Sequence, residues 1–432
     1  MTITAIAGTS LAPDPALPHR DELLDDALVG QRLERLLARD GDGGSRVLSC
    51  VRTRAKYRVG ESLRATFEVR LRGATRLVSA RMFAAGAPRP EWAKPAPDAD
   101  SDVTGSSPTT VADPSIDTDF WVFPADRKLI GLPALLWPPR EARTAFAATW
   151  TRSRLLAYSP EKAATVRCLT ERGDTLGYAK VQLGDEGLRS IAVLQAVTSG
   201  LDGDERLRLP AAVGYVAQHH MALYDAAPGR PLAELPATAM PEAMAALGRA
   251  LTVLHHQPVG DLPPFSRLLP SRIVRAAELI GAARPDVADE VALLVAALLA
   301  APPGAASTVL LHGDVHPKNV LVHAAGVSLI DLDQAAVGPA AAELGGLLAR
   351  LWCPRGRTGL SASTGTAAVT ALLDSYQGTL ERDDLLWYAA AALLVERGLR
   401  ALNRVDHEGL MELSSVLAVA RQWAERREGA WT

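Results

Sequence analysis

One polar stretch between two apolar runs interrupts the helical half of the chain. From about residue 240 onward, apolar residues recur at helical spacing, as in PEAMAALGRALTVLHH, but 309–322, VLLHGDVHPKNVLV, predicts a strand, a turn and a strand. Before residue 240 the chain is rich in short β-prone runs that are separated by turns. This order of elements predicts an α+β chain with two lobes, and not an alternating βαβ sheet.

The bulk composition limits the possible partners. The chain has 432 residues, 48% of them hydrophobic, which is enough for several domains or lobes. Its 46 basic and 49 acidic residues give a formal net charge of −3, so the sequence offers no general polyanion-binding surface and argues against nucleic acid. The longest apolar helical run is interrupted by Glu396 and Arg397, which argues against a membrane span.

The first residues and the cysteines both favour the cytoplasm. The first residues contain neither a basic region nor a long apolar run, so they do not predict a signal peptide. The three cysteines are far apart and predict no disulfide framework and no metal-binding spacing. We therefore expect a soluble protein of the reducing cytoplasm.

The order of elements predicts four segments. Residues 1–85 combine an amphipathic helix with β-prone runs and predict an additional β-rich N-terminal domain. Residues 86–118, rich in Pro, Asp, Ser and Thr without periodicity, predict a flexible linker. A β-rich lobe over 119–225 and a helical lobe over 226–432 complete the chain. The first domain is either a degenerate copy of the β-rich lobe, with Arg81 in the place of Lys180, or an unrelated set of hairpins.

The hairpin brings oxygen-bearing side chains together. Asp314 lies in the loop before the strand NVLVH, and a tight turn at 324–326 returns the chain as SLIDLD. Asn319 at the start of one strand and Asp331 at the end of the other then lie close together, with Asp314 beside them. Carboxylate and amide oxygens suit Mg²⁺ better than Zn²⁺. Magnesium held by one or two side chains and by phosphate oxygens is typical of phosphoryl transfer, and a nearby carboxylate can accept the proton of an attacking hydroxyl.

HGDVHPKN followed by LIDLD resembles the signature of the aminoglycoside phosphotransferase and choline kinase family. The resemblance covers about residues 154–400 and implies a protein-kinase-like two-lobed fold that uses ATP and Mg²⁺. Carried over by position, it implies that Asp314 is the catalytic base, that His312 supports its loop, and that Asn319 and Asp331 coordinate magnesium. Glu343 takes the place of a family aspartate that anchors the catalytic loop.

The same resemblance assigns the nucleotide site. Lys180, in the strand LGYAKVQ, would hold the α- and β-phosphates, and Glu186, which opens the next helix, is the nearest acid to orient it. Glu186 is equally well explained as an acid that is favoured at a helix start. The run MALYDAAPGRPL resembles the hinge between the lobes that holds adenine, which gives Asp225 and Ala227 as candidate nucleotide contacts.

These observations predict an ATP- and Mg²⁺-dependent phosphotransferase that acts on a hydroxyl of a small molecule, such as a sugar, an aminoglycoside or an amino alcohol. A kinase for a peptide Ser/Thr hydroxyl and a nucleotide-binding pseudokinase without transfer are the alternatives. A metallophosphoesterase also contains GDVH-like elements, but the upstream DxH and downstream GNH that it needs are absent from the sequence.

Overall fold

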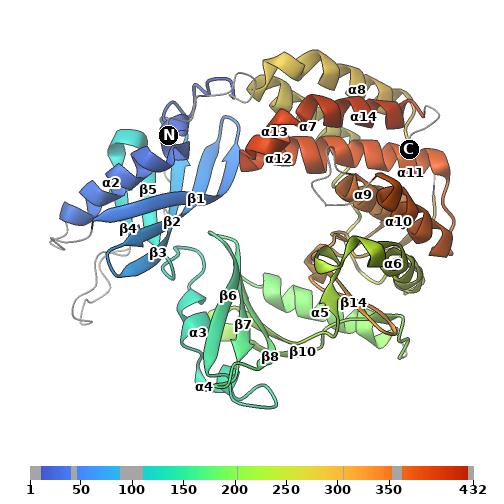
Figure 1. Cartoon of the computed structure of the whole chain (residues 1–432), viewed down its shortest axis with the longest axis horizontal. Helices are drawn as coiled ribbons and strands as arrows, with labels where there is room; N and C mark the ends of the chain where they lie inside the picture. The colour runs from blue at the N-terminus through green and yellow to red at the C-terminus, as the bar shows by residue number, and fades with distance from the viewer. Residues whose placement is uncertain are drawn as a thin grey trace.

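The computed structural model describes residues 11–39, 46–87, 110–201, 203–304, 306–352 and 362–426. Figure 1 shows three parts: a first sheet with its helices, a second sheet below it, and a helical region that fills the other side of the molecule. The expected two-lobed, protein-kinase-like α+β fold is confirmed, since the second sheet and the helical region are its β-rich and helical lobes. None of the helices in the described part of the chain is long and apolar enough to cross a membrane.

The first sheet is antiparallel and has the strand order β1-β2-β3-β5-β4. One of its faces packs Leu63 and Phe67 against helical residues such as Leu23 and Val29, while the opposite face carries charged side chains. The elements of this part are α1 (Arg20–Leu24), α2 (Asp26–Arg39), β1 (Val47–Arg58), β2 (Ser62–Leu71), β3 (Ala74–Phe83), β4 (Thr110–Asp113), η2 (Pro114–Ile116) and β5 (Thr118–Val122).

The first sheet includes residues beyond the predicted end of the first domain at residue 85. β4 comes from the predicted linker 86–118, and β5 crosses the predicted border between residues 118 and 119. β5 pairs with β3, in the register Ala80 to Phe120, and thereby covers the edge that the β1–β3 meander leaves open. The sheet therefore extends to Val122. Residues 88–109 of the predicted linker lie outside the described residues.

The second sheet has the order β10-β11-β8-β7-β6. Buried side chains such as Val166, Ala179 and Leu223 form its own core with Leu132 and Trp150. Like the first sheet it starts with a three-strand meander, and Arg81 and Lys180 both lie on the third strand; the duplication stays a prediction. Its elements are α3 (Leu132–Leu136), α4 (Arg140–Arg143), β6 (Arg152–Ser159), β7 (Ala163–Leu169), β8 (Thr175–Gln182), α5 (Glu186–Ser199), β10 (Ala212–Val216), η3 (Ala217–His219) and β11 (Met221–Asp225).

The helical region packs through small side chains. A Cβ atom on Gly345 in α9 would lie 2.7 Å from the backbone nitrogen of Ala389 in α11, so glycine allows these two helices to approach closely. The helices are η4 (Leu232–Glu234), η5 (Ala237–Ala239), α6 (Met240–His255), α7 (Pro270–Ala283), η6 (Pro285–Val287), α8 (Ala288–Ala300), α9 (Ala340–Leu351), α10 (Ala362–Ser375), α11 (Arg382–Ala392), the π-helix η9 (Leu393–Gly398), α12 (Leu399–Arg404), α13 (His407–Met411) and α14 (Leu413–Ala424).

The polar stretch of the helical region forms two short antiparallel pairs. β14 (Val320–His323) and β15 (Gly326–Leu329) form the expected hairpin, flanked by β12 (Arg230–Pro231) and β9 (Leu207–Arg208). β13 (Thr308–Leu311) pairs instead with β16 (Ala336–Pro339). The returning segment 327–338 is therefore not one strand, because η7 (Leu332–Gln334) separates β15 from β16.

Candidate active site

A buried glutamate fixes the loop that carries Asp314. Glu343 on α9 accepts hydrogen bonds from the backbone nitrogens of His312, at 3.1 Å, and of Gly313, at 2.6 Å. Its Oε2 is also 3.0 Å from Nε2 of His255. Burial favours the neutral acid, but the contact with His255 and the backbone donors outweigh it and hold the pKa of Glu343 below its usual value. The anchoring role expected for Glu343 agrees with these contacts.

The loop turns sharply where a side chain would not fit. Gly313 has φ of 76°, and a Cβ atom there would lie 2.0 Å from the carbonyl oxygen of Gln334. His312 precedes it and is fully buried. Its Nε2 is 3.0 Å from the carbonyl oxygen of Ile330, and its Nδ1 accepts from the backbone nitrogen of Asp314 at 3.3 Å. Because a carbonyl only accepts, the neutral ring carries its proton on Nε2. His312 thus joins the loop to the strand end, as the resemblance implied.

Asp314 lies in an ionic network with two arginines. Its Oδ1 accepts from Arg350 at 2.7 Å and from Arg267 at 3.3 Å. Glu396 binds the same two arginines, with its Oε2 2.7 Å from Nη2 of Arg350. Burial would raise the pKa of Asp314, but the charges of Arg350 and Arg267 outweigh it and lower the pKa below its usual value. Asp314 is therefore an ionised acceptor, and among the described residues its Oδ2 makes no hydrogen bond.

The hairpin brings Asn319 and Asp331 to the same end. The backbone nitrogen of Ile330 donates to the carbonyl oxygen of Asn319 at 3.0 Å, and the Nδ2 of Asn319 donates to the carbonyl oxygen of Asp314 at 3.2 Å. Asp331 follows Ile330 with φ of 68°, in the left-handed region, where aspartate is better tolerated than most side chains. The two predicted magnesium ligands, Asn319 and Asp331, are thus neighbours of the predicted base, Asp314.

Lys180 meets this cluster from the other lobe. Its Nζ lies 2.7 Å from Oδ1 of Asp331 and 2.5 Å from Oδ2 of Asp333. Gln182 donates to the same Asp333 oxygen at 3.0 Å. Burial would lower the pKa of Lys180, but the two carboxylates outweigh it and raise that pKa, so the side chain is an ammonium.

Glu186 does not take part in this arrangement. It is the first residue of α5 and is half-buried, and no hydrogen bond or ion pair in the described part of the chain joins its carboxylate to Lys180. The acids that contact Lys180 are Asp331 and Asp333, from the other lobe. The prediction that Glu186 orients Lys180 is corrected here. Contact between β8 and the end of the hairpin brings Asp331 and Asp333, which are distant in sequence, closer to the lysine than Glu186.

Asp225 and Ala227 lie where the second sheet passes into the helical region. Asp225 ends β11, and its Oδ1 accepts from the backbone nitrogen of Ala211 at 2.6 Å. Ala227 is half-buried, and the carbonyl oxygen of the next residue, Pro228, accepts from Ser328 of β15 at 2.7 Å. The side chain of Asp225 therefore closes the β10–β11 pair, which leaves backbone groups as the part of this segment that is suited to a nucleotide base.

The oxygen donors suit a magnesium ion that is held in part by phosphates. The side-chain nitrogen Nδ2 of Asn319 binds the loop, so its side-chain oxygen Oδ1 remains available, and Asp331 adds a carboxylate. The described residues contain no group of three or more His, Cys, Asp or Glu side chains arranged for a metal. A two-residue set matches the hard-cation mode in which phosphate and water oxygens supply the other ligands.

Sequence reasoning missed several residues of this site. Neither Arg267 nor Arg350 was predicted, and Glu396 was considered only as an interruption of an apolar run, whereas its side chain is 10% exposed and binds both arginines. The signal was present in LLVERGL, where a charged pair interrupts an apolar run within what is now a π-helix, a feature frequent at functional sites. His255 was not predicted as a residue of the site either, and it bridges Glu343 and Tyr376 inside the core.

Residues 182–386 match the model of the phosphotransferase enzyme family. This segment belongs to the phosphotransferase enzyme family. The match confirms the resemblance that was inferred from HGDVHPKN and LIDLD, and it covers slightly less than half of the chain. The matched segment includes Asp314, Asn319 and Asp331. It begins two residues after Lys180, so the assignment of Lys180 to the site rests on its contacts with Asp331 and Asp333.

Solved structures of phosphotransferases are similar to this chain. They include aminoglycoside phosphotransferase APH(3'')-Id from Streptomyces rimosus, with 21% identity over 56% of this chain and 92% of that one and a TM-score of 0.38. Macrolide 2'-phosphotransferase MphH from Brachybacterium faecium has 17% identity over 66% of this chain and 97% of that one, with a TM-score of 0.44. A thermostable mutant of APH(4)-Ia has 15% identity, covers 63% and 95%, and has a TM-score of 0.48. No curated protein sequence matches the chain.

Proposed function

We propose that the protein transfers the γ-phosphoryl group of ATP, with Mg²⁺, to a hydroxyl of a small molecule. The observation that carries the proposal is the meeting of Lys180 from one lobe with Asp331 of the other, beside the loop of Asp314. A cation for phosphates, hard oxygen donors and an ionised carboxylate are the groups that phosphoryl transfer needs, since its catalysis is mostly positioning and charge stabilisation.

In this proposal each side chain has a separate task. Lys180 exchanges its contacts with Asp331 and Asp333 for oxygens of the nucleotide phosphates, and Asn319 and Asp331 hold the magnesium ion. When bound, that ion neutralises charge on the phosphates. Oδ2 of Asp314 accepts a hydrogen bond from the acceptor hydroxyl and takes its proton, while Arg350 and Arg267 fix the other oxygen.

The bonds change in a simple exchange. A new bond forms between the acceptor oxygen and the γ-phosphorus, and the bond from that phosphorus to the β–γ bridging oxygen breaks. ADP leaves with the electron pair of that bond, and the proton of the hydroxyl goes to Asp314. The anchored loop, held by Glu343, keeps the carboxylate in place during this exchange.

The test is a screen for acceptor-dependent ADP formation with ATP and Mg²⁺. The panel contains sugars, amino alcohols, aminoglycosides, nucleosides and a Ser/Thr peptide, and the Asp314→Ala variant is the control. Turnover with one small-molecule class that disappears in the variant supports the proposal. Turnover with the peptide alone supports the peptide kinase, and nucleotide-dependent thermal stabilisation without any turnover supports the pseudokinase.

A further inference from the structure

Three basic side chains lie in a row across the first sheet. Lys56 on β1 pairs in register with Arg64 on β2, and Arg64 pairs with Arg81 on β3. Arg54, two residues before Lys56, lies on the same face of the sheet. Like charges directly opposite each other on neighbouring strands destabilise a sheet. Within the sheet, Asp119 on β5 pairs in register with Arg81, so the like charges that the sheet leaves opposite each other are those of Lys56 and Arg64.

A carboxylate from outside the sheet compensates part of the row. Glu161, in the loop between β6 and β7, binds Arg64 at 3.1 Å and also Arg81, and its side chain is 2% exposed. Among the described residues, Arg54 donates to the backbone oxygen of Tyr158 alone, at 3.2 Å. Lys56 has no hydrogen-bond or ion-pair partner among the described residues, and its charge remains uncompensated.

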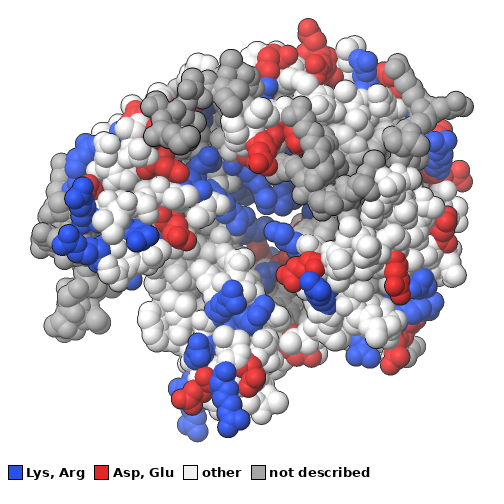
Figure 2. Space-filling model, in the orientation of Figure 1, with Lys and Arg blue, Asp and Glu red and all other residues white. Residues whose placement is uncertain are grey.

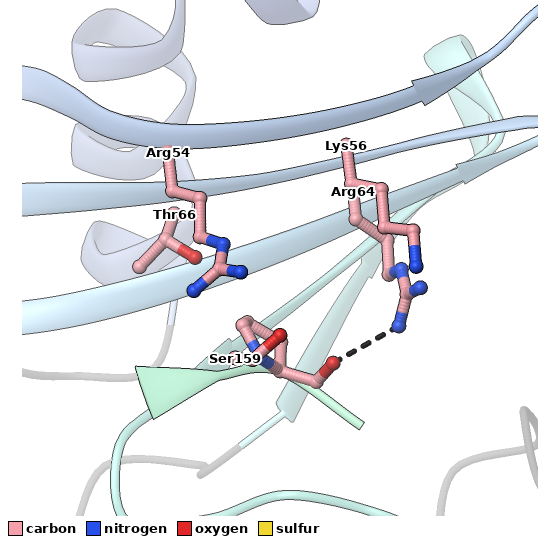
Figure 3. A pocket seen from close by; sticks show the side chains of 6 residues that line it. Arg54, Lys56, Arg64, Thr66 and Ser159 are labelled. Carbon is pink, nitrogen blue, oxygen red and sulfur yellow. Dashed lines mark hydrogen bonds between the residues drawn. The ribbon is translucent and has the colours of Figure 1, made fainter. Parts of the chain in front are cut away.

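Lys56 lines a pocket between the sheet and this loop together with Arg54 and Arg64. Figure 3 shows Arg54, Lys56 and Arg64 extending from the strands toward Ser159. The pocket is a small recess that is partly open to solvent, with about 10 Å³ of space for the centre of a water-sized sphere, and no carboxylate is among the described residues that line it. Burial within this recess, followed by the charges of Arg64 and other neighbouring cations, lowers the pKa of Lys56 to about 8. The lining residues are Arg54, Lys56, Arg64, Thr66, Ser159 and Pro160.

Positive charge continues from the pocket toward the candidate active site. α12 packs against β1, and the charge of Arg404 at its end acts on Arg54. One turn earlier on α12, Arg400 lies within electrostatic range of Asp314 and Arg350. Figure 2 shows basic side chains gathered along the central hollow of the molecule. A ligand could thus place an anionic end near Lys56 and extend toward Asp314.

We propose that the pocket of Arg54, Lys56 and Arg64 binds a phosphate group, and that this group is a phosphate monoester carried by the acceptor. The guanidinium forks, the ammonium and the hydroxyls of Thr66 and Ser159 provide donors from several directions, which suits a tetrahedral dianion. The phosphate site stands on the geometry of the pocket alone. The assignment to the acceptor rests on the proposed function, and it narrows the substrate class to phosphorylated hydroxyl compounds.

The binding test measures the melting temperature with inorganic phosphate against chloride at equal ionic strength. We expect phosphate to raise Tm by about 2–4 °C in the wild type. The shift is lost in Lys56→Met, which should fold because it relieves repulsion within the row. It persists in Arg70→Ala, a matched change on the same strand face six residues beyond Arg64, and in Lys180→Met. No shift in the wild type, or a shift lost only in Lys180→Met, would overturn the phosphate site.

The kinetic test separates the sources of the phosphate. Phosphorylated acceptors and their unphosphorylated counterparts are compared in the wild type and in Lys56→Met. We expect the variant to raise KM for the phosphorylated acceptor about 10-fold, with KM for ATP unchanged. Equal kcat/KM for the phosphorylated and unphosphorylated acceptors would overturn the acceptor assignment and indicate that the pocket binds free phosphate. A raised KM for ATP alone would also overturn it and indicate that the pocket binds the nucleotide. If no acceptor turns over, the proposed function fails while the binding test still decides the phosphate site.

Discussion

The ammonium of Lys180 lies 2.7 Å from Oδ1 of Asp331, although 151 residues separate them in the chain. This contact joins the third strand of the second sheet to the end of the hairpin in the helical region. Asp333 shares the same ammonium from the next turn. These ion pairs hold Lys180 close to Asp331. In the proposed function, nucleotide phosphates would bind the ammonium of Lys180 and a metal ion would bind the carboxylate of Asp331.

The first prediction concerns Lys180→Met. The change removes the cation and leaves two neighbouring carboxylates without it, so both phosphate binding and the approach of the lobes weaken. We expect kcat/KM for ATP to fall about 10²-fold or more, because the lost donor stabilises charge in the transition state. Steady-state kinetics measure it, with Arg154→Ala on exposed β6 as the matched control. An unchanged kcat/KM would remove Lys180 from the nucleotide site.

The second prediction separates the two acids. Asp331→Asn removes the carboxylate assigned to magnesium, whereas Asp333→Asn removes only a partner of Lys180 and Gln182. We expect Asp331→Asn to raise the Mg²⁺ concentration for half-maximal activity about 10-fold or more, and Asp333→Asn to change it much less. Magnesium titrations of the two variants side by side give the answer. The reverse order would exchange the roles of the two residues.

The third prediction concerns the contact between the first sheet and the β6–β7 loop. Glu161→Gln removes the carboxylate that Arg64 and Arg81 share. Removal of one partner from a largely buried ion pair costs about 3 kcal/mol, so the free energy of unfolding should fall by about that amount. Urea unfolding measures it, and Glu171→Gln, at an exposed turn of the same sheet, is the control. A loss below about 0.5 kcal/mol in Glu161→Gln, the size expected of an ordinary surface change, would contradict the role of this contact.

The fourth prediction uses the pKa of Lys56, which is lowered to about 8 from the usual 10.5. Between pH 8 and 10.5 the unfolded chain then binds more protons at this site than the folded one. The free energy of unfolding of the wild type should therefore rise with pH in this window relative to Lys56→Met, and the difference should be flat below pH 8. The cations that act on Lys56 are Arg64, Arg58, Lys162 and Arg54.

Unfolding curves of both proteins from pH 7 to 10.5 test this prediction, since other groups titrate in both and cancel in the difference. Saturating phosphate should shrink the effect, because a bound dianion favours the charged lysine and raises its pKa. A difference that falls as pH rises through this window would show that Lys56 has a compensating partner.

The sequence was most informative where chemistry is local. HGDVHPKN and LIDLD lie at the two ends of one hairpin, β14–β15, so their spacing alone predicted that Asp314, Asn319 and Asp331 lie close together. The partners of Lys180 were not local: Glu186 is six residues away in sequence, but strand-to-hairpin contact selects Asp331 and Asp333. Arg350 and Arg267 come from distant segments whose helical packing no short pattern reports. β5 was missed as part of the first sheet because its partner strand is separated from it by the long segment taken for a linker.

The most direct test of the phosphotransferase account is the kcat of Asp314→Asn with the acceptor that the screen identifies. We predict a fall of about 10²–10⁴-fold in kcat, with the affinity for ATP and Mg²⁺ unchanged, since the proposed role of Asp314 is to contact the acceptor hydroxyl and not the nucleotide. A variant that keeps the wild-type kcat, or one that loses nucleotide binding together with turnover, would contradict it.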